Sequence, residues 1–276
     1  MASDPRSIRL RVVDGQPAVK RWTAVSPLRD LAAAIAFLTR VPVPERWLGD
    51  DRTGAAAFGL AGAAVGAAAA IPLIITGQAH PGPAAVAGLA ILAIASGTLH
   101  LDGLADTADA LVAPAGAADR ARMDPRAGTA GVVAVVLILL LDATLIGELA
   151  SIDGRLAAAA LINAGAASRT AATVAGVLAG PTRAGGRLGT WFATHLRPTD
   201  ARLALASTVV VAGIGAALTG RSIVGGLIGG AVLGAAAGWL ILRLRHRLDG
   251  DGFGALVELT FAAVLAATLA ARAIGG

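Results

Sequence analysis

Three aspartates with helical spacing lie near the middle of the chain. Asp102, Asp106 and Asp109 are spaced i, i+4 and i+7, so on a helix their carboxylates share one face. Like charges placed this way repel one another, which costs about 0.2–0.5 kcal/mol per pair on an exposed helix. A divalent cation removes that cost, and ligands that are all oxygen suit Mg²⁺ or Mn²⁺. The spacing therefore predicts a metal site, with a solvated acidic helix surface as the alternative.

Three more polar residues lie close to this cluster in the sequence. His100 precedes it, and is either a structural histidine or a contact to a carboxylate or to substrate. Asp124 and Arg126 come just before a Gly-containing turn and a long apolar run. An arginine and free backbone amides at the start of a helix suit an anion. A basic flank with a plain turn fits this segment equally well.

Further candidates lie in or beside apolar runs. Arg169 follows Ser168 inside such a run, where a guanidinium costs about 2.5–3.5 kcal/mol to bury in lipid. Arg169 should therefore face the protein interior and pair with an acid or a phosphate. Asp251 and Glu258 are spaced i, i+7 at the Gly-rich start of the last apolar run. This segment fits an approaching ion or phosphate, and also fits a plain loop.

The composition indicates which kind of element positions these residues. The 276 residues are 56% hydrophobic and 15% charged, with a mean hydropathy of +0.72. Soluble domains are roughly 45–50% apolar and about 25% charged. The absence of cysteine excludes disulfides, a thiol nucleophile and cysteine-bound metals. The arginines are not interleaved with aromatics, so we expect no nucleic-acid partner. The chain is predicted to be an all-α, polytopic membrane bundle in contact with lipid.

About seven transmembrane helices are expected. They cover residues 54–76, 83–99, 130–149, 156–178, 203–218, 223–242 and 253–274. Residues 27–40 form a shorter apolar stretch, predicted to be an interfacial or re-entrant helix that ends at the prolines of residues 41–44. Gly225, Gly229 and Gly230 have the small-residue spacing of a helix-packing surface. Residues 1–26 are a polar extension, and residues 27–276 form a single membrane-embedded catalytic domain.

The basic residues predict the orientation of the spans. Of the 23 Lys and Arg residues, 19 fall on the side that holds the N-terminus when the spans alternate. Cytoplasmic loops of membrane proteins carry this excess. We therefore expect a multi-pass protein of the cytoplasmic (inner) membrane, with a cytoplasmic N-terminus. The acidic cluster lies on the same side, so the active site is expected at the cytoplasmic face, where carboxylates and arginines together suit phosphoryl transfer.

These segments resemble one enzyme family, the adenosylcobinamide-GDP ribazoletransferases, also called cobalamin synthases. The segment HLDGLADTADAL (100–111) is similar to the signature of that family. DPRAGTAG (124–131) and SRTAA (168–172) resemble two later blocks, and Arg183 with the RLG at 187–189 resembles an arginine–glycine segment. The resemblance covers most of the chain, from FLTRVPVPERW (37–47) to GDGFGALVEL (250–259).

The resemblance implies a Mg²⁺-dependent membrane transferase acting late in cobalamin biosynthesis. Such an enzyme transfers phosphocobinamide from adenosylcobinamide-GDP to α-ribazole, or to its 5′-phosphate, and releases GMP. Asp102, Asp106 and Asp109 would be the catalytic, metal-binding residues, with Asp109 expected as the base. Asp251 and Glu258 would complete a second metal site or bind the incoming nucleoside. Substrate and phosphate contacts would come from His100, Asp124, Arg126, Ser168, Arg169 and Arg183. A homo-oligomer, or a complex with other cobalamin-assembly enzymes, is left open.

Other classes of membrane protein also carry intramembrane acids. A CDP-alcohol phosphotransferase would have Ala-Arg following a D-G pair, and no such pair follows Asp102-Gly103 at the right place. A metal-ion transporter would hold its acids near the bilayer midplane on broken helices. A purely structural membrane scaffold gives no reason to align three carboxylates.

The predicted orientation can be tested with reactive tags. Tags placed at residues 78–82 and 150–154 should react with an impermeant reagent from outside intact cells. Tags at residues 115–120 should react only after the membrane is opened, because that segment lies on the Arg-rich side. The opposite labelling pattern would overturn the topology.

Overall fold

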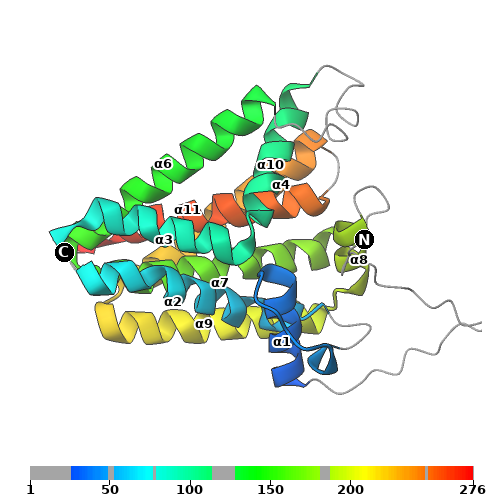
Figure 1. The fold of residues 1–276 in the computed structure, drawn as a ribbon, viewed down its shortest axis with the longest axis horizontal. Coiled ribbons are helices and arrows are strands. Elements are labelled where there is room, and N and C mark those ends of the chain that lie inside the picture. The colour runs from blue at the N-terminus through cyan, green and yellow to red at the C-terminus, as the bar shows by residue number, and fades with distance from the viewer. Residues whose placement is uncertain are drawn as a thin grey trace, which may run out of the picture.

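The computed structural model describes residues 26–48, 53–76, 79–113, 128–180, 187–245 and 248–275, and all regular structure in these ranges is helical (Figure 1). The α-helices are α1 (Pro27–Leu38), α2 (Phe58–Thr76), α3 (Pro81–Ser96), α4 (Leu99–Val112), α6 (Thr129–Ile152), α7 (Gly154–Ala179), α8 (Arg187–His195), α9 (Pro198–Thr219), α10 (Ser222–Arg245) and α11 (Gly250–Gly275). Two 3₁₀ turns, η1 (Glu45–Trp47) and η2 (Ala55–Ala57), lie between α1 and α2. The predicted all-α class is confirmed.

Five helical segments within these ranges are long and apolar enough to cross a membrane. They are Ala55–Thr76, Thr129–Ile152, Pro198–Thr219, Ser222–Arg245 and Gly250–Gly275. The pair α3 and α4 qualifies as a sixth only when taken together, and it is bent by 90°. The described residues therefore hold five or six such spans, compared with the seven expected. Large apolar side chains on the outer faces of α6, α9 and α10, such as Leu137, Val209 and Val232, are exposed. The chain is a multi-pass membrane protein.

Helix α7 is the expected span that is not apolar enough to qualify, and it lies inside the bundle. It packs against α2, α9, α10, α11 and α6, so little of it faces outward (Figure 1). A side chain on Gly165 of α7 would overlap the backbone of Gly62 in α2, and the reverse also holds. Lipid provides no hydrophobic force between helices, so close packing of small residues holds them together. Surrounded by protein, α7 needs no apolar outer face.

The predicted small-residue surface of α10 is confirmed. Added side chains on Gly225 and Gly229 would collide with Ala271 and Ala267 of α11. Gly230 likewise allows α11 to approach at backbone distance. These glycines therefore set the packing of α10 against α11.

A sharp elbow joins α3 to α4. Gly97 and Thr98 both have positive φ angles, of 60° and 59°, so the chain leaves the direction of α3 at this point. For the β-branched Thr98 this conformation is uncommon. The Arg40 side chain packs against Gly97, and the Arg40 amide donates to the carbonyl of Ala95 at 2.7 Å. The segment that follows α1 thus holds the elbow, and α4 leaves the expected 83–99 span at a right angle.

An aromatic cluster fixes the two short helices to the bundle. Phe37 of α1, Phe58 of α2 and Phe192 of α8 have ring centroids 5.3–5.5 Å apart. Phe253 of α11 meets Phe192 edge-on at 5.3 Å, and Trp191 stacks on Phe37 at 6.3 Å. Such pairs add about 0.5–1.5 kcal/mol each beyond the area they bury. Helix α1 therefore docks across the bundle, and it is too short to span a membrane. Helix α8 was not predicted from the sequence.

Enlarging Gly165 should destabilise the bundle. Gly165→Leu forces α2 and α7 apart, and overpacking of this kind typically costs about 1–3 kcal/mol. Thermal unfolding in detergent should show a clear fall in the midpoint. Gly213→Leu is the matched control, because Gly213 is exposed on α9 with no atom near an added side chain. Equal midpoints for the two variants would contradict the close α2–α7 contact.

Candidate active site

The helices that carry most of the predicted acidic residues cross at a pair of glycines. A side chain on Gly103 of α4 would overlap the backbone of Asp251 in α11. A side chain on Gly254 of α11 would lie 3.0 Å from the Cα of Gly103. The two helices therefore meet at backbone distance. This contact places Asp251, in the first turn of α11, beside the part of α4 that carries Asp102 and Asp106.

Helix α4 has an acidic side and a buried side. Asp102 is exposed, and Asp106 and Asp109 are half-buried, so the three aspartates lie on one helix as their spacing predicts. His100 and Thr107 on the other side are buried. The helix thus separates the protein interior from a carboxylate-rich outer face.

Asp109 is held by the start of α6. Its Oδ2 accepts a hydrogen bond from the Gly128 amide at 2.7 Å, and its Oδ1 accepts one from the Gly131 amide at 2.8 Å. The Gly-containing turn before α6 was predicted to suit an anion. In the structure these amides bind an anion of the chain itself, the Asp109 carboxylate.

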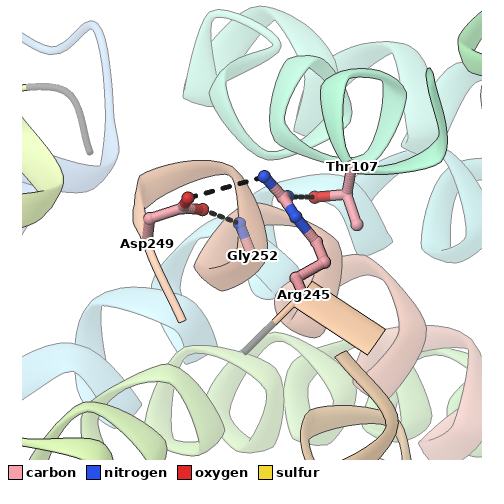
Figure 2. Close-up of polar contacts among 4 residues, drawn as sticks. All are labelled: Thr107, Arg245, Asp249 and Gly252. Carbon is pink, nitrogen blue, oxygen red and sulfur yellow. Dashed lines mark hydrogen bonds and ion pairs between the residues drawn. The ribbon is translucent and has the colours of Figure 1, made fainter. Parts of the chain in front are cut away.

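Figure 2 shows the polar contacts that join α10, α4 and the start of α11. Arg245, in the last turn of α10, donates from Nη1 to Thr107 Oγ1 at 3.1 Å. Its Nη2 donates to Asp249 Oδ2 at 3.5 Å. Asp249 Oδ1 accepts from the Gly252 amide at 3.1 Å, which caps the first turn of α11. Neither Arg245 nor Thr107 was predicted to be near the site. The i, i+4 spacing of Arg245 and Asp249 is the sequence pattern that could have indicated their contact.

The buried side of α4 faces a second polar cluster. Arg169 of α7 is 5% exposed and donates from Nη1 to Ser168 Oγ at 3.0 Å. Arg169 interacts electrostatically with Glu258 of α11 and with His100 of α4. Arg169 therefore faces the protein interior, as its position in an apolar run predicted, and the charge of Glu258 attracts it.

A small pocket adjoins this cluster. Asp142 of α6, Arg169 and Glu258 line it together with apolar residues of α3, α4 and α11. Its volume is about 30 Å³, and one water molecule needs roughly 10–15 Å³. His100 Nδ1 and Asp142 Oδ1 have no hydrogen-bond partner among the described residues. Water in the pocket is the natural partner for the Asp142 oxygen.

The predicted site residues thus fall into two groups. Asp102, Asp106 and Asp109 share one face of α4, with Asp251 beside that helix. The other group contains the buried His100, Ser168 and Arg169 and the half-buried Glu258. Asp124, Arg126 and Arg183 lie outside the described residues, as do residues 1–25 of the polar extension. Among the residues described, no three His, Asp or Glu side chains converge on a single ion position.

Fold and site together define a class of protein: a multi-pass, all-helical membrane protein with carboxylates gathered where two helices meet. The particular family comes from comparison with known proteins. A family model described as cobalamin-5-phosphate synthase matches residues 30–269, and the chain belongs to that family. No solved structure matches the chain.

Relatives that match most of the chain share one name. A protein of Rhizobium johnstonii is 34% identical over 254 residues, which cover 86% of this chain and 95% of the relative. One of Pseudomonas paraeruginosa is 35% identical over 261 residues, covering 87% and 97%. Both are named adenosylcobinamide-GDP ribazoletransferase. The chain is therefore a transferase of cobalamin biosynthesis, as the resemblance implied.

Removing the charge of Glu258 should destabilise the folded protein. Glu258→Gln removes a charge that offsets that of the buried Arg169, and an uncompensated buried charge is strongly unfavourable. The midpoint of thermal unfolding in detergent should fall markedly. Glu148→Gln, at an exposed position of α6, is the control and should change little. If Glu258→Gln unfolds like the wild type, the attraction between Glu258 and Arg169 has no structural role.

Proposed function

We propose that the chain transfers phosphocobinamide from adenosylcobinamide-GDP to α-ribazole or α-ribazole 5′-phosphate. The products are adenosylcobalamin, or its 5′-phosphate, and GMP. The observation that carries this proposal is the family match over residues 30–269, together with relatives named for this reaction. The family match supports neither alternative, a CDP-alcohol phosphotransferase or a metal-ion transporter.

The transfer exchanges one phosphorus–oxygen bond for another. A ribose hydroxyl oxygen attacks the phosphorus on the cobinamide side of the diphosphate. The bond from that phosphorus to the bridging oxygen breaks, and GMP leaves with that oxygen. The hydroxyl proton passes to a base, and positioned carboxylates are common bases for such a step.

We assign Asp102 and Asp106 as the residues that hold Mg²⁺. Their carboxylates lie one helical turn apart on α4, and carboxylate oxygens are the ligands Mg²⁺ prefers. Protein sites for Mg²⁺ commonly supply one or two carboxylates and leave the remaining positions to water and substrate phosphates. A pair of aspartates without a third converging acid suits that mode. When bound, Mg²⁺ would neutralise charge on the diphosphate.

The neighbouring helix provides the other proposed contact. Asp251 lies beside Gly103, on the helix that faces α4, and its carboxylate suits the hydroxyl of the incoming nucleoside as a hydrogen-bond acceptor. Glu258 is not included, because it lines the small pocket beside Arg169 on the other side of α4. Arg169 and Ser168 then support the site from inside and do not contact phosphate.

The site is proposed to face the cytoplasm. The Arg-rich bias of the loops supports this orientation, since 19 of the 23 Lys and Arg residues fall on one predicted side. Helices α1, α4 and α8 lie toward one end of the bundle and the C-terminus at the other (Figure 1). This arrangement is compatible with spans that alternate as predicted. The cytoplasmic membrane follows as the proposed location.

Removing one proposed metal ligand should stop the transfer. Asp106→Asn keeps the size of the side chain and removes its charge. GMP release from adenosylcobinamide-GDP and α-ribazole with Mg²⁺ should fall at least about a hundredfold, the scale of losing one preorganised transition-state contact. The variant should still insert into the membrane. Glu148→Gln, which changes an exposed acid on α6, should retain full activity. Wild-type turnover of Asp106→Asn would refute the assignment.

A further inference from the structure

The carboxylate of Asp109 is held by the backbone of the chain itself. Both oxygens accept hydrogen bonds from backbone amides, those of Gly128 and Gly131, which lie at the start of α6. Bonds from amides to a carboxylate are charge-assisted, and the positive end of a helix dipole adds to them. One carboxylate therefore satisfies two of the four amides that α6 leaves without an internal partner.

The glycines that meet this carboxylate provide an independent observation. A side chain on Gly128 would collide with the Asp109 carboxylate, and Asp109 atoms are the nearest that it would meet. A side chain on Gly131 would collide with the same carboxylate and would also crowd Ala105. Gly128 has a φ of −77°, which any residue can adopt, so its backbone does not require glycine. Glycine is required there because Asp109 occupies the space of a side chain.

We infer that Asp109 is a positioning residue, which fastens the start of α6 to the acidic face of α4. This inference rests on the proposed function, because it takes Asp102 and Asp106 as the metal-binding pair. It replaces the expectation that Asp109 acts as the base or as a third ligand. It also relates two separate segments of the sequence, 100–111 and 124–131, because the carboxylate in the first segment fits against the glycines of the second.

Metal affinity separates a positioning residue from a ligand. Mn²⁺ alone is the probe, titrated onto the purified protein in detergent and followed by electron paramagnetic resonance. Asp106→Asn should weaken Mn²⁺ binding at least about tenfold, because it removes one of the two carboxylates proposed to hold the ion. Asp109→Ala should change Mn²⁺ affinity less than about threefold, while GMP release per folded protein falls about tenfold. Loss of Mn²⁺ binding in Asp109→Ala, equal to that of Asp106→Asn, would overturn the inference.

A double-mutant cycle tests the contact itself. Gly128→Ala alone should lower both turnover and the unfolding midpoint, because the new methyl group pushes against Asp109. In the Asp109→Ala background the same change should cost nothing, so the two effects should not add. Gly82→Ala is the control, since no atom lies near an added side chain there. Additive effects, or a harmless Gly128→Ala in the wild type, would refute the contact.

A distance measurement gives a third readout. The chain has no cysteine, so cysteines placed at the exposed Val112 of α4 and Val133 of α6 can be spin-labelled without background. The distance distribution should be narrow in the wild type and broader in Asp109→Ala. An unchanged distribution would contradict the inference. If Asp106→Asn retains Mn²⁺ binding and turnover, the proposed metal site is wrong. The double-mutant cycle and the distance measurement still test the role of Asp109 in that case.

Discussion

The contact between Gly103 and Gly254 determines where the candidate active site lies. Helices α4 and α11 touch through their backbones at this point, and the two glycines allow this close approach. In that position Asp102 faces outward and His100 inward. A side chain at either glycine would move α4 away from α11 and carry the aspartates with it. The position of the site therefore depends on these two glycines as much as on the acidic residues.

The interior of the bundle supports this arrangement with charge. An isolated charge in an apolar interior is strongly unfavourable unless another charge nearby compensates it. Arg169 of α7 and Glu258 of α11 interact on the inner side of α4, close to His100. On the same side of α4, Arg245 of α10 joins Thr107 to the capping residue Asp249 (Figure 2). Polar groups of α7, α10 and α11 thus surround the buried side of α4.

Periodicity and composition were sufficient for part of this structure. The all-α membrane bundle, the common face of Asp102, Asp106 and Asp109, and the glycine surface of α10 were predicted correctly. Each depends on residues within one helix, where spacing fixes which side chains share a face. The end of the first short helix before the prolines at 41–44 is another local property, because proline cannot continue a helix.

Features that depend on two helices could not be predicted. Spacing does not say which residues of another helix an acid lies near, so the closeness of Glu258 to Arg169 was not predicted. The same limit hid the contact of Asp109 with the start of α6. The elbow at Gly97 and Thr98 escaped prediction because a positive φ at a threonine has no sequence pattern. Helix α7 was predicted as an ordinary span, whereas its alanines pack against other helices.

The buried arginine also constrains the order of events during synthesis. Helix α7 carries Arg169 and is less apolar than its neighbours, so its transfer from the translocon into lipid on its own is unfavourable. Glu258, whose charge attracts Arg169, belongs to α11, which is synthesised after α7, α9 and α10. Helix α2 is synthesised before α7 and packs against it through Gly62 and Gly165. The part of the bundle that surrounds α7 is therefore made both before and after it, and Arg169 meets the charge of Glu258 only once α11 has been synthesised.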